Sequence, residues 1–85
     1  MIIRRTNAFL KDYRGLPFEI RERVDKQLRL LFDDFRHPSL RLKKLSGTDK
    51  FEIRISKGYR LTLRLDKGVV ELRRVGTHDI LRDEG

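Results

Sequence analysis

Three side chains in the C-terminal half of the chain, Arg54, Arg60 and His78, have chemistry suited to a phosphate group. Histidine takes up and releases a proton near neutral pH, which suits acid–base catalysis. The guanidinium of arginine has fixed donors that match phosphate oxygens and stabilise charge on them. Metal-free cleavage of RNA needs both groups, because the 2′-hydroxyl loses a proton, the phosphate gains charge and the 5′-oxygen is protonated. We therefore take His78 as a candidate acid or base, and the two arginines as candidate phosphate ligands.

Spacing alone does not single out this chemistry. Arginines on the solvent face of a strand, and a lone histidine after one, are more often solvated surface residues. The chain has no Gly-rich phosphate-binding loop and no paired-carboxylate motif. A shared site is favoured only if the surrounding strands bring the three residues together.

Residues 51–79 alternate apolar and polar side chains at strand period and reverse twice, at Lys57-Gly58 and at Lys67-Gly68. In the first hairpin, a three-residue loop 56–58 with Gly58 in the left-handed conformation keeps the apolar side chains on one face. This register places Arg54 directly opposite Arg60. Like charges in that position destabilise a sheet by roughly a few tenths of a kcal/mol, a conflict that a bound phosphate would relieve.

The second hairpin keeps its faces separate with a two-residue loop, Lys67-Gly68. The pairs expected opposite one another are Leu65 with Val70, Leu63 with Leu72, Arg64 with Glu71, Thr62 with Arg73, and Arg60 with Val75. Arg74 then falls on the apolar face opposite Leu61, so we expect the last strand to bend or bulge there. His78 follows this strand and is expected within side-chain reach of both candidate arginines.

The two registers predict a sheet with one apolar face and one basic face. The apolar face collects Phe51, Ile53, Ile55, Tyr59, Leu61, Leu63, Leu65, Val70 and Leu72. The basic face collects Glu52, Arg54, Arg60, Thr62, Arg64, Glu71 and Arg73. Besides the candidate catalytic residues, we expect Lys43, Lys44, Arg64, Arg73 and Arg74 to bind RNA, with the lysines positioning its backbone.

The first half of the chain predicts a short strand over residues 1–5 and two helices. Thr6 or Asn7 is expected to cap the first helix, Gly15 to end it, and Pro17 to open the second. An apolar stripe at helical spacing, facing a core or docking a partner helix, contains Ile20, Val24, Leu28, Leu31 and Phe35. Pro38 stops this helix, with His37 as a structural boundary residue. Residues 39–45 are expected to form a strand or an extended loop.

Length and composition restrict the remaining possibilities. Eighty-five residues predict a single domain, 1–85, of the α+β class: an N-terminal strand, two helices, then a three- to four-stranded antiparallel sheet packed on the helices. The chain has 21 Lys and Arg against 13 Asp and Glu, a net charge of +8. This excess indicates a polyanionic partner, either nucleic acid, an acidic protein or an anionic membrane; the alternative is a simply solvated surface.

The chain also lacks features of several other classes of protein. It has no cysteine and only two histidines, so we expect no disulfide, no metal site and no cofactor. No apolar run exceeds three residues, which predicts no membrane span. The N-terminal residues MIIRRT lack the long apolar core of a secretory signal. The expected location is the cytoplasm.

The chain resembles the RelE/ParE superfamily of bacterial toxin–antitoxin systems. The order of the predicted elements is similar, and the matching stretches are Leu16-Pro17, HPSLRLKKLSG (37–47), FEIRISKGYRLTL (51–63) and RRVGTHDIL (73–81). Together they cover well over half the chain. The resemblance implies a RelE-like fold and a ribosome-dependent endonuclease that cleaves mRNA in the ribosomal A site. It also implies a cognate antitoxin that wraps the toxin, which is either a monomer or part of that complex.

The resemblance also implies roles for individual residues. Basic residues on the central strands of RelE-like members activate the 2′-hydroxyl and hold the phosphate, and these positions correspond to Arg54 and Arg60. The stretch VGTHD is similar to the YafQ-type position that supplies the leaving-group acid, which corresponds to His78. Glu52 stands where the RelE-like pattern has a lysine.

Other functions remain open within this family. ParE-like members poison DNA gyrase and need no catalytic residues. The alternative hypothesis is therefore a non-catalytic gyrase inhibitor, or an inactive homologue that binds RNA or the ribosome. In a third interpretation the basic face chiefly docks an acidic antitoxin.

Overall fold

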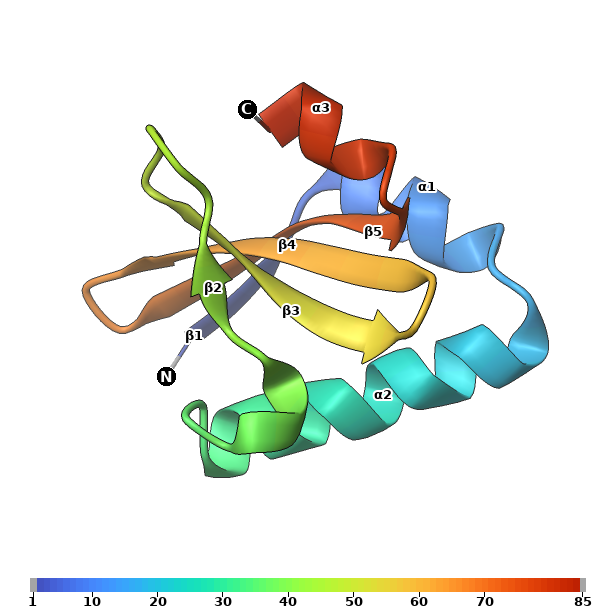
Figure 1. The fold of residues 1–85 in the computed structure, drawn as a ribbon, viewed down its shortest axis with the longest axis horizontal. Helices are drawn as coiled ribbons and strands as arrows, with labels where there is room; N and C mark the ends of the chain where they lie inside the picture. Colours follow the sequence, from blue (N-terminus) through green and yellow to red (C-terminus); the bar gives the residue numbers. More distant parts are fainter. Residues whose placement is uncertain (1, 85) are drawn as a thin grey trace.

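The computed structural model describes residues 2–84 apart from the side chain of Asp83, with helices on both faces of one five-stranded sheet (Figure 1). The strands are β1 (Ile2–Arg5), β2 (Lys43–Lys44), β3 (Lys50–Ser56), β4 (Tyr59–Asp66) and β5 (Val69–Thr77). The helices are α1 (Asn7–Arg14), α2 (Phe18–Asp33), the 3₁₀ turn η1 (Pro38–Leu40) and α3 (Ile80–Glu84). The predicted α+β class is confirmed.

The sheet is mixed, with strand order β1-β5-β4-β3-β2. Strands β2 to β5 form an antiparallel meander, whereas β1 pairs in parallel with β5, Ile2 opposite Val69 and Arg5 opposite Leu72. A parallel pair needs a long crossover connection, and α1 and α2 lie within the chain that joins these two strands. The predicted N-terminal strand and antiparallel sheet are confirmed, the latter as the four strands β2 to β5, and the structure adds that β1 joins this sheet in parallel.

The boundaries of the first two helices follow their capping residues. The hydroxyl of Thr6 accepts a hydrogen bond from the Phe9 N–H at 3.0 Å, and Gly15 ends α1, as predicted. Helix α2 begins directly after Pro17, also as predicted. The two helices are joined by the Tyr13 hydroxyl, which donates to Asp25 Oδ1 at 2.8 Å.

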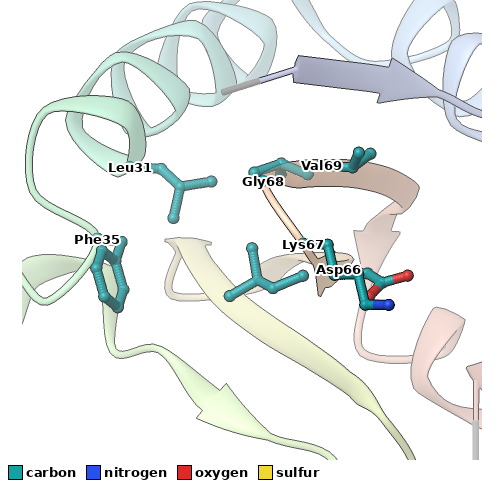
Figure 2. Close-up of a pocket in the computed structure, with 8 residues that line it drawn as sticks. Leu31, Phe35, Asp66, Lys67, Gly68 and Val69 are labelled. Atoms are coloured by element: carbon teal, nitrogen blue, oxygen red, sulfur yellow. The ribbon is translucent and has the colours of Figure 1, made fainter.

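Helix α2 ends earlier than predicted, at Asp33 instead of next to Pro38. Asp34 has an extended φ of −158°, and its side chain accepts a hydrogen bond from the Arg36 N–H, which stabilises a turn in place of a further helical turn. Phe35 therefore lies outside the helix and is 43% exposed, not part of the helical stripe. It lines an apolar pocket of about 240 Å³ together with Leu31 and the β4–β5 turn (Figure 2).

Residues 39–45, predicted as a strand or an extended loop, contain a short strand and non-strand segments, and the 3₁₀ turn η1 comes first. His37 accepts a hydrogen bond from the Ser39 N–H at its Nδ1 and so caps η1, which confirms it as a boundary residue. Leu40 in this turn is completely buried. Only Lys43 and Lys44 form a strand, β2, at the edge of the sheet.

The core lies between α1, α2 and one face of the sheet. Val24, Ile53, Leu61, Leu63 and Leu72 have no exposed surface. All nine residues of the predicted apolar face are buried or partly buried against this core, so that face is confirmed.

The first hairpin has the predicted register but a different loop. Arg54 lies opposite Arg60, as expected, but Ser56 pairs with Tyr59 and Ile55 is the extra residue of a bulge. The turn itself has two residues, and Gly58 does not have a positive φ, so the three-residue loop with a left-handed Gly58 is wrong. A bulge accommodates the odd residue within the strand and keeps Ile55 buried, at 3% exposure.

The second hairpin confirms the expected turn. Leu65 pairs with Val70 and Arg64 with Glu71 around Lys67 and Gly68, whose φ values of 43° and 80° fit a type I′ turn.

The end of β5 shows why the predicted bulge forms. The register shifts so that Arg74 lies opposite Thr62, Val75 opposite Leu61 and Gly76 opposite Arg60. The bulge was expected, but the pairs of Thr62 with Arg73 and of Arg60 with Val75 are wrong, and Arg74 is not on the apolar face. The shift buries the apolar Val75, at 1% exposure, in place of a charged side chain.

A third helix, which the sequence analysis did not predict, covers part of the basic face. Figure 1 shows α3 on the opposite side of the sheet from α2. Beneath α3, Thr62 has no exposed surface, and Glu84 of α3 is 5% exposed. A Cβ atom at Gly76 would sit 3.0 Å from Ile80 Cγ2, so this glycine allows α3 to approach β5 closely. No helix within residues 2–84 is long and apolar enough to cross a membrane.

Candidate functional site

The strands bring Arg54, Arg60 and the start of the His78 segment to one end of the sheet. Arg54 of β3 lies opposite Arg60 of β4, and Arg60 lies opposite Gly76 of β5. His78 follows two residues later, directly after Thr77 at the end of β5, next to the β3–β4 turn. Arg54 and Arg60 are half-buried and His78 is exposed, so solvent reaches all three.

Arg60 is held against the β3–β4 turn. Its Nη1 donates hydrogen bonds to the backbone oxygens of Ser56 at 2.7 Å, Tyr59 at 2.9 Å and Lys57 at 3.2 Å. These bonds satisfy carbonyls that the bulged end of the hairpin would otherwise leave to water. They also fix the position of the guanidinium, although they occupy one of its three nitrogens.

Arg54 is positioned through its backbone. Its carbonyl accepts a hydrogen bond of 2.8 Å from Nε2 of Gln27, a buried residue of α2. None of the side chains that the structure describes forms an ion pair with Arg54 or Arg60, although the two residues face each other. A dianionic or monoanionic group between them would reduce their repulsion.

His78 lies where β5 gives way to α3. Its carbonyl accepts the Leu81 N–H at 3.1 Å, and the next residue, Asp79, forms an exposed ion pair of 3.7 Å with Arg82. The backbone of His78 is therefore anchored by the first turn of α3 while the residue itself is accessible. An exposed imidazole at this position is able to exchange protons with a bound molecule or with water.

Three of the candidate RNA-binding arginines are engaged in ion pairs within the molecule. Arg73 Nε lies 2.8 Å from Glu84 Oε2, and its Nη1 lies 2.6 Å from Glu71 Oε1. The hydrogen bond to Glu84 is the largest cause that raises the pKa of Arg73 above its ordinary value. Arg74 Nε lies 2.6 Å from Asp12 Oδ2 on α1.

Arg64 is more loosely paired and more exposed. Its Nη1 lies 3.4 Å from Asp49 and its Nε 3.9 Å from Glu71, and the side chain is 40% exposed. Lys43 and Lys44 are exposed on β2, with Lys43 opposite Glu52. Of the candidate RNA-binding residues, these three are the most accessible.

Glu52 lies beside the candidate site on the same strand as Arg54. One of its carboxylate oxygens, Oε2, is buried without a hydrogen-bond partner in the described structure, as is the hydroxyl of Thr62 directly opposite. A carboxylate in this position opposes the binding of another anion nearby.

The sequence analysis missed the carboxylates that hold Arg73 and Arg74. Glu71 was expected on the basic face, but Asp12 and Glu84 lie 62 and 11 residues away from their arginines in sequence. The sequence offered one indication of such a carboxylate. The predicted register placed Arg74 on the apolar face, and a charged residue there needs a partner of opposite charge.

Comparison with solved structures shows what this fold resembles. The toxin–antitoxin complex RelBE from E. coli matches with 29% identity and a TM-score of 0.72 over 89% of this chain and 94% of that chain. The YoeB/ParE toxin from Agrobacterium tumefaciens matches with 16% identity and a TM-score of 0.79, over 92% and 99%. The RelB–RelE complex from Methanococcus jannaschii matches with 22% identity and a TM-score of 0.76, over 95% and 96%.

These matches assign the chain its fold class. No family model matches the sequence, and no curated protein gives a significant match. The fold is nevertheless that of the RelE/ParE toxin superfamily, as the sequence resemblance predicted.

Proposed function

We propose that this protein is the toxin of a type II toxin–antitoxin system and that it cleaves mRNA in the ribosomal A site without a metal. The observation that supports this proposal is the placement of Arg54, Arg60 and His78 at one accessible end of the sheet in a RelE-like fold. In the proposed reaction the 2′-hydroxyl attacks the adjacent phosphate, and the bond to the 5′-oxygen breaks.

Each residue has a role suited to its position. The 2′-hydroxyl proton passes to water, which reaches the site, while Arg54 stabilises the negative charge that develops and holds the phosphate together with Arg60, whose guanidinium is already fixed by the turn. His78, in its protonated form, donates a proton to the leaving 5′-oxygen. Lys43, Lys44 and Arg64 contact the RNA backbone directly. Arg73 and Arg74, held by carboxylates, contribute mainly to the positive field of the surface.

The proposed partners are the ribosome-bound mRNA and a cognate antitoxin, and the proposed location is the cytoplasm. Several of the matched solved structures are toxin–antitoxin complexes. The net charge of +8 suits both an RNA and an acidic polypeptide.

Primer extension on a reporter mRNA, with purified protein and with or without ribosomes, tests this function. We expect discrete cuts only with ribosomes, and a loss of at least about 100-fold in rate for His78→Ala and Arg60→Ala. His37→Ala and Arg29→Ala are matched controls, because they remove the same side-chain types from exposed positions away from the site. Cleavage that survives His78→Ala at the original rate would contradict the proposed role of the imidazole.

Two observations favour a second candidate, a non-catalytic homologue. Glu52 stands beside Arg54 where the RelE-like pattern has a lysine, and Arg60 Nη1 is occupied by backbone carbonyls. Such a protein would inhibit DNA gyrase, as ParE-like members do, or bind RNA or the ribosome without cutting. Growth arrest with an SOS response and intact mRNA would support the gyrase branch, whereas Glu52→Lys should raise cleavage if the catalytic proposal holds.

A further inference from the structure

A cleft of about 300 Å³ opens between α2, η1 and the end of β3. The residues that line it are Arg23, Lys26, Gln27, Ser39, Arg54, Ile55, Ser56 and Lys57. Four of these eight carry a positive charge, and none of the lining residues that the structure describes is acidic. The volume lies at the lower end of the range for small-molecule sites.

Other charged hollows of the molecule differ in composition. The small cleft beside Arg64 is also lined by Asp66 and Glu71. The shallow surface along α2 is lined by Glu19 and Glu22 together with Arg23, Lys26 and Arg29. Those surfaces contain their own counter-charges. Arg23 and Lys26 line both that surface and the cleft between α2 and β3, but neither they nor Lys57 forms an ion pair with any side chain that the structure describes. The cleft itself therefore carries an excess of positive charge.

Gln27 makes the wall of the cleft rigid. It is 9% exposed, and its Nε2 donates both to the Ser39 carbonyl at 3.3 Å and to the Arg54 carbonyl at 2.8 Å. One buried amide therefore ties α2 to η1 and to β3. Three of the four charged lining residues, Arg23, Lys26 and Arg54, therefore lie on a helix and a strand that this amide holds together.

The cleft lies at the same end of the sheet as the candidate active site. Lys57 belongs to the β3–β4 turn, and Thr77, the residue before His78, lies opposite Tyr59 just after that turn. Two strand spacings, about 10 Å, separate β3 from β5. A polyanion with regularly spaced charges that crosses this end of the sheet would meet His78, then Arg60 and Arg54, and then the cleft.

We propose that this cleft binds a backbone phosphate of single-stranded RNA other than the phosphate that is cleaved. The proposal rests on the function proposed above and assigns to Arg23 and Lys26, two residues outside the candidate active site, a part in substrate binding. A phosphate suits the guanidinium of Arg23 and the point charge of Lys26. The succession of His78, Arg60, Arg54 and the basic cleft along one end of the sheet favours an RNA strand over a separate acidic peptide.

Fluorescence anisotropy with a 2′-O-methyl RNA oligonucleotide, which lacks the attacking hydroxyl, tests the cleft without cleavage. The variant Arg23→Gln/Lys26→Gln should lower the slope of log affinity against log salt by roughly 0.7, the contribution of one single-strand phosphate contact. If the affinities converge at about 1 M salt, the loss at 0.1 M salt is roughly 5-fold. The matched control is Arg14→Gln/Arg29→Gln, which removes the same charge from exposed residues outside the cleft.

The outcomes separate this proposal from the function on which it rests. Equal losses for the two double variants, or no loss for the cleft variant, would overturn the phosphate site even if ribosome-dependent cleavage is observed. A selective loss in the cleft variant supports the site even if no cleavage is detected, in which case only the proposed catalysis fails. Unchanged RNA binding together with weaker binding of a poly-glutamate peptide would assign the cleft to an acidic polypeptide instead. Circular dichroism establishes that both variants are folded.

Discussion

Two groups of arginines on the basic face of the sheet differ in what surrounds them. Arg73 and Arg74 on β5 lie within 4 Å of carboxylates from other segments. We call these the paired arginines. Arg54 near the end of β3 and Arg60 near the start of β4 flank the turn between these strands. They have no ion pair within the described residues, and we call them the unpaired arginines.

The difference separates charges that hold the fold from charges available to a ligand. The paired arginines attach α1 and α3 to β5, because Asp12 lies on α1 and Glu84 on α3. The unpaired arginines face each other at an accessible end of the sheet, where their repulsion is relieved only by an anion from outside. The same residue type thus has a structural role on β5 and a proposed functional role on β3 and β4.

The largest effect is expected for Arg73→Ala. This change would leave Glu71 and Glu84 without their closest cation, and the Glu84 side chain is only 4% exposed. Removal of one partner of a largely buried pair costs about 3 kcal/mol, so the free energy of unfolding should fall by about that amount in urea titrations.

A double variant, Arg73→Ala/Glu84→Ala, controls for this interpretation. It should recover part of the lost stability, because the uncompensated carboxylate is removed as well. A loss below about 1 kcal/mol for the single variant would mean that water replaces the arginine, and the structural role of this group would be wrong.

A smaller effect on stability is expected for Arg60→Ala. The three backbone carbonyls at the turn would lose their common donor, but they lie near the surface and water replaces part of the interaction, so we expect a loss of about 1 kcal/mol. RNA binding should weaken at the same time. Comparison with Arg60→Lys, which keeps the charge but not the planar fork, separates the two contributions.

Arg54→Gln sharpens the comparison most directly, since it should separate stability from binding. Removing one of two facing charges should leave the free energy of unfolding unchanged or raise it by roughly a few tenths of a kcal/mol. The affinity for 2′-O-methyl RNA should fall, with a salt slope smaller by about 0.7. A marked loss of stability would instead place Arg54 among the residues that hold the fold.

The smallest effect is expected for Tyr13→Phe, which removes a neutral donor to an accessible carboxylate. The hydrogen bond to Asp25 raises the pKa of Tyr13 above its ordinary value of 10.0, because it favours the protonated phenol. Its contribution, below about 1 kcal/mol, is therefore fully present below pH 10 and is lost as the pH rises through the raised pKa. Unfolding curves of the two proteins should differ at pH 7 and converge at strongly alkaline pH.

Local patterns in the sequence were sufficient to predict much of the sheet. Strand-period alternation from Phe51 to Leu72, with turn residues at Lys57-Gly58 and Lys67-Gly68, specified which residues face the core and set Arg54 opposite Arg60. A shift of one residue would have exposed the whole apolar set, so the register was strongly constrained. The capping residue Thr6 and the breaks at Gly15 and Pro17 were equally local signals.

What only the tertiary structure decided involves residues distant in sequence or in different elements. The parallel addition of β1 to β5 joins segments more than 60 residues apart, and no local pattern encodes that pairing. The position of the β5 bulge follows from burying Val75 while Arg74 reaches Asp12 on α1. The cover of α3 over Thr62 depends on Gly76 and on the Arg73–Glu84 pair. The sequence by itself thus determined the faces of the strands, because side-chain alternation is a local property. Which arginines are neutralised and which remain available to a ligand was decided by long-range contacts, because a charge is compensated only by the groups that the fold brings beside it.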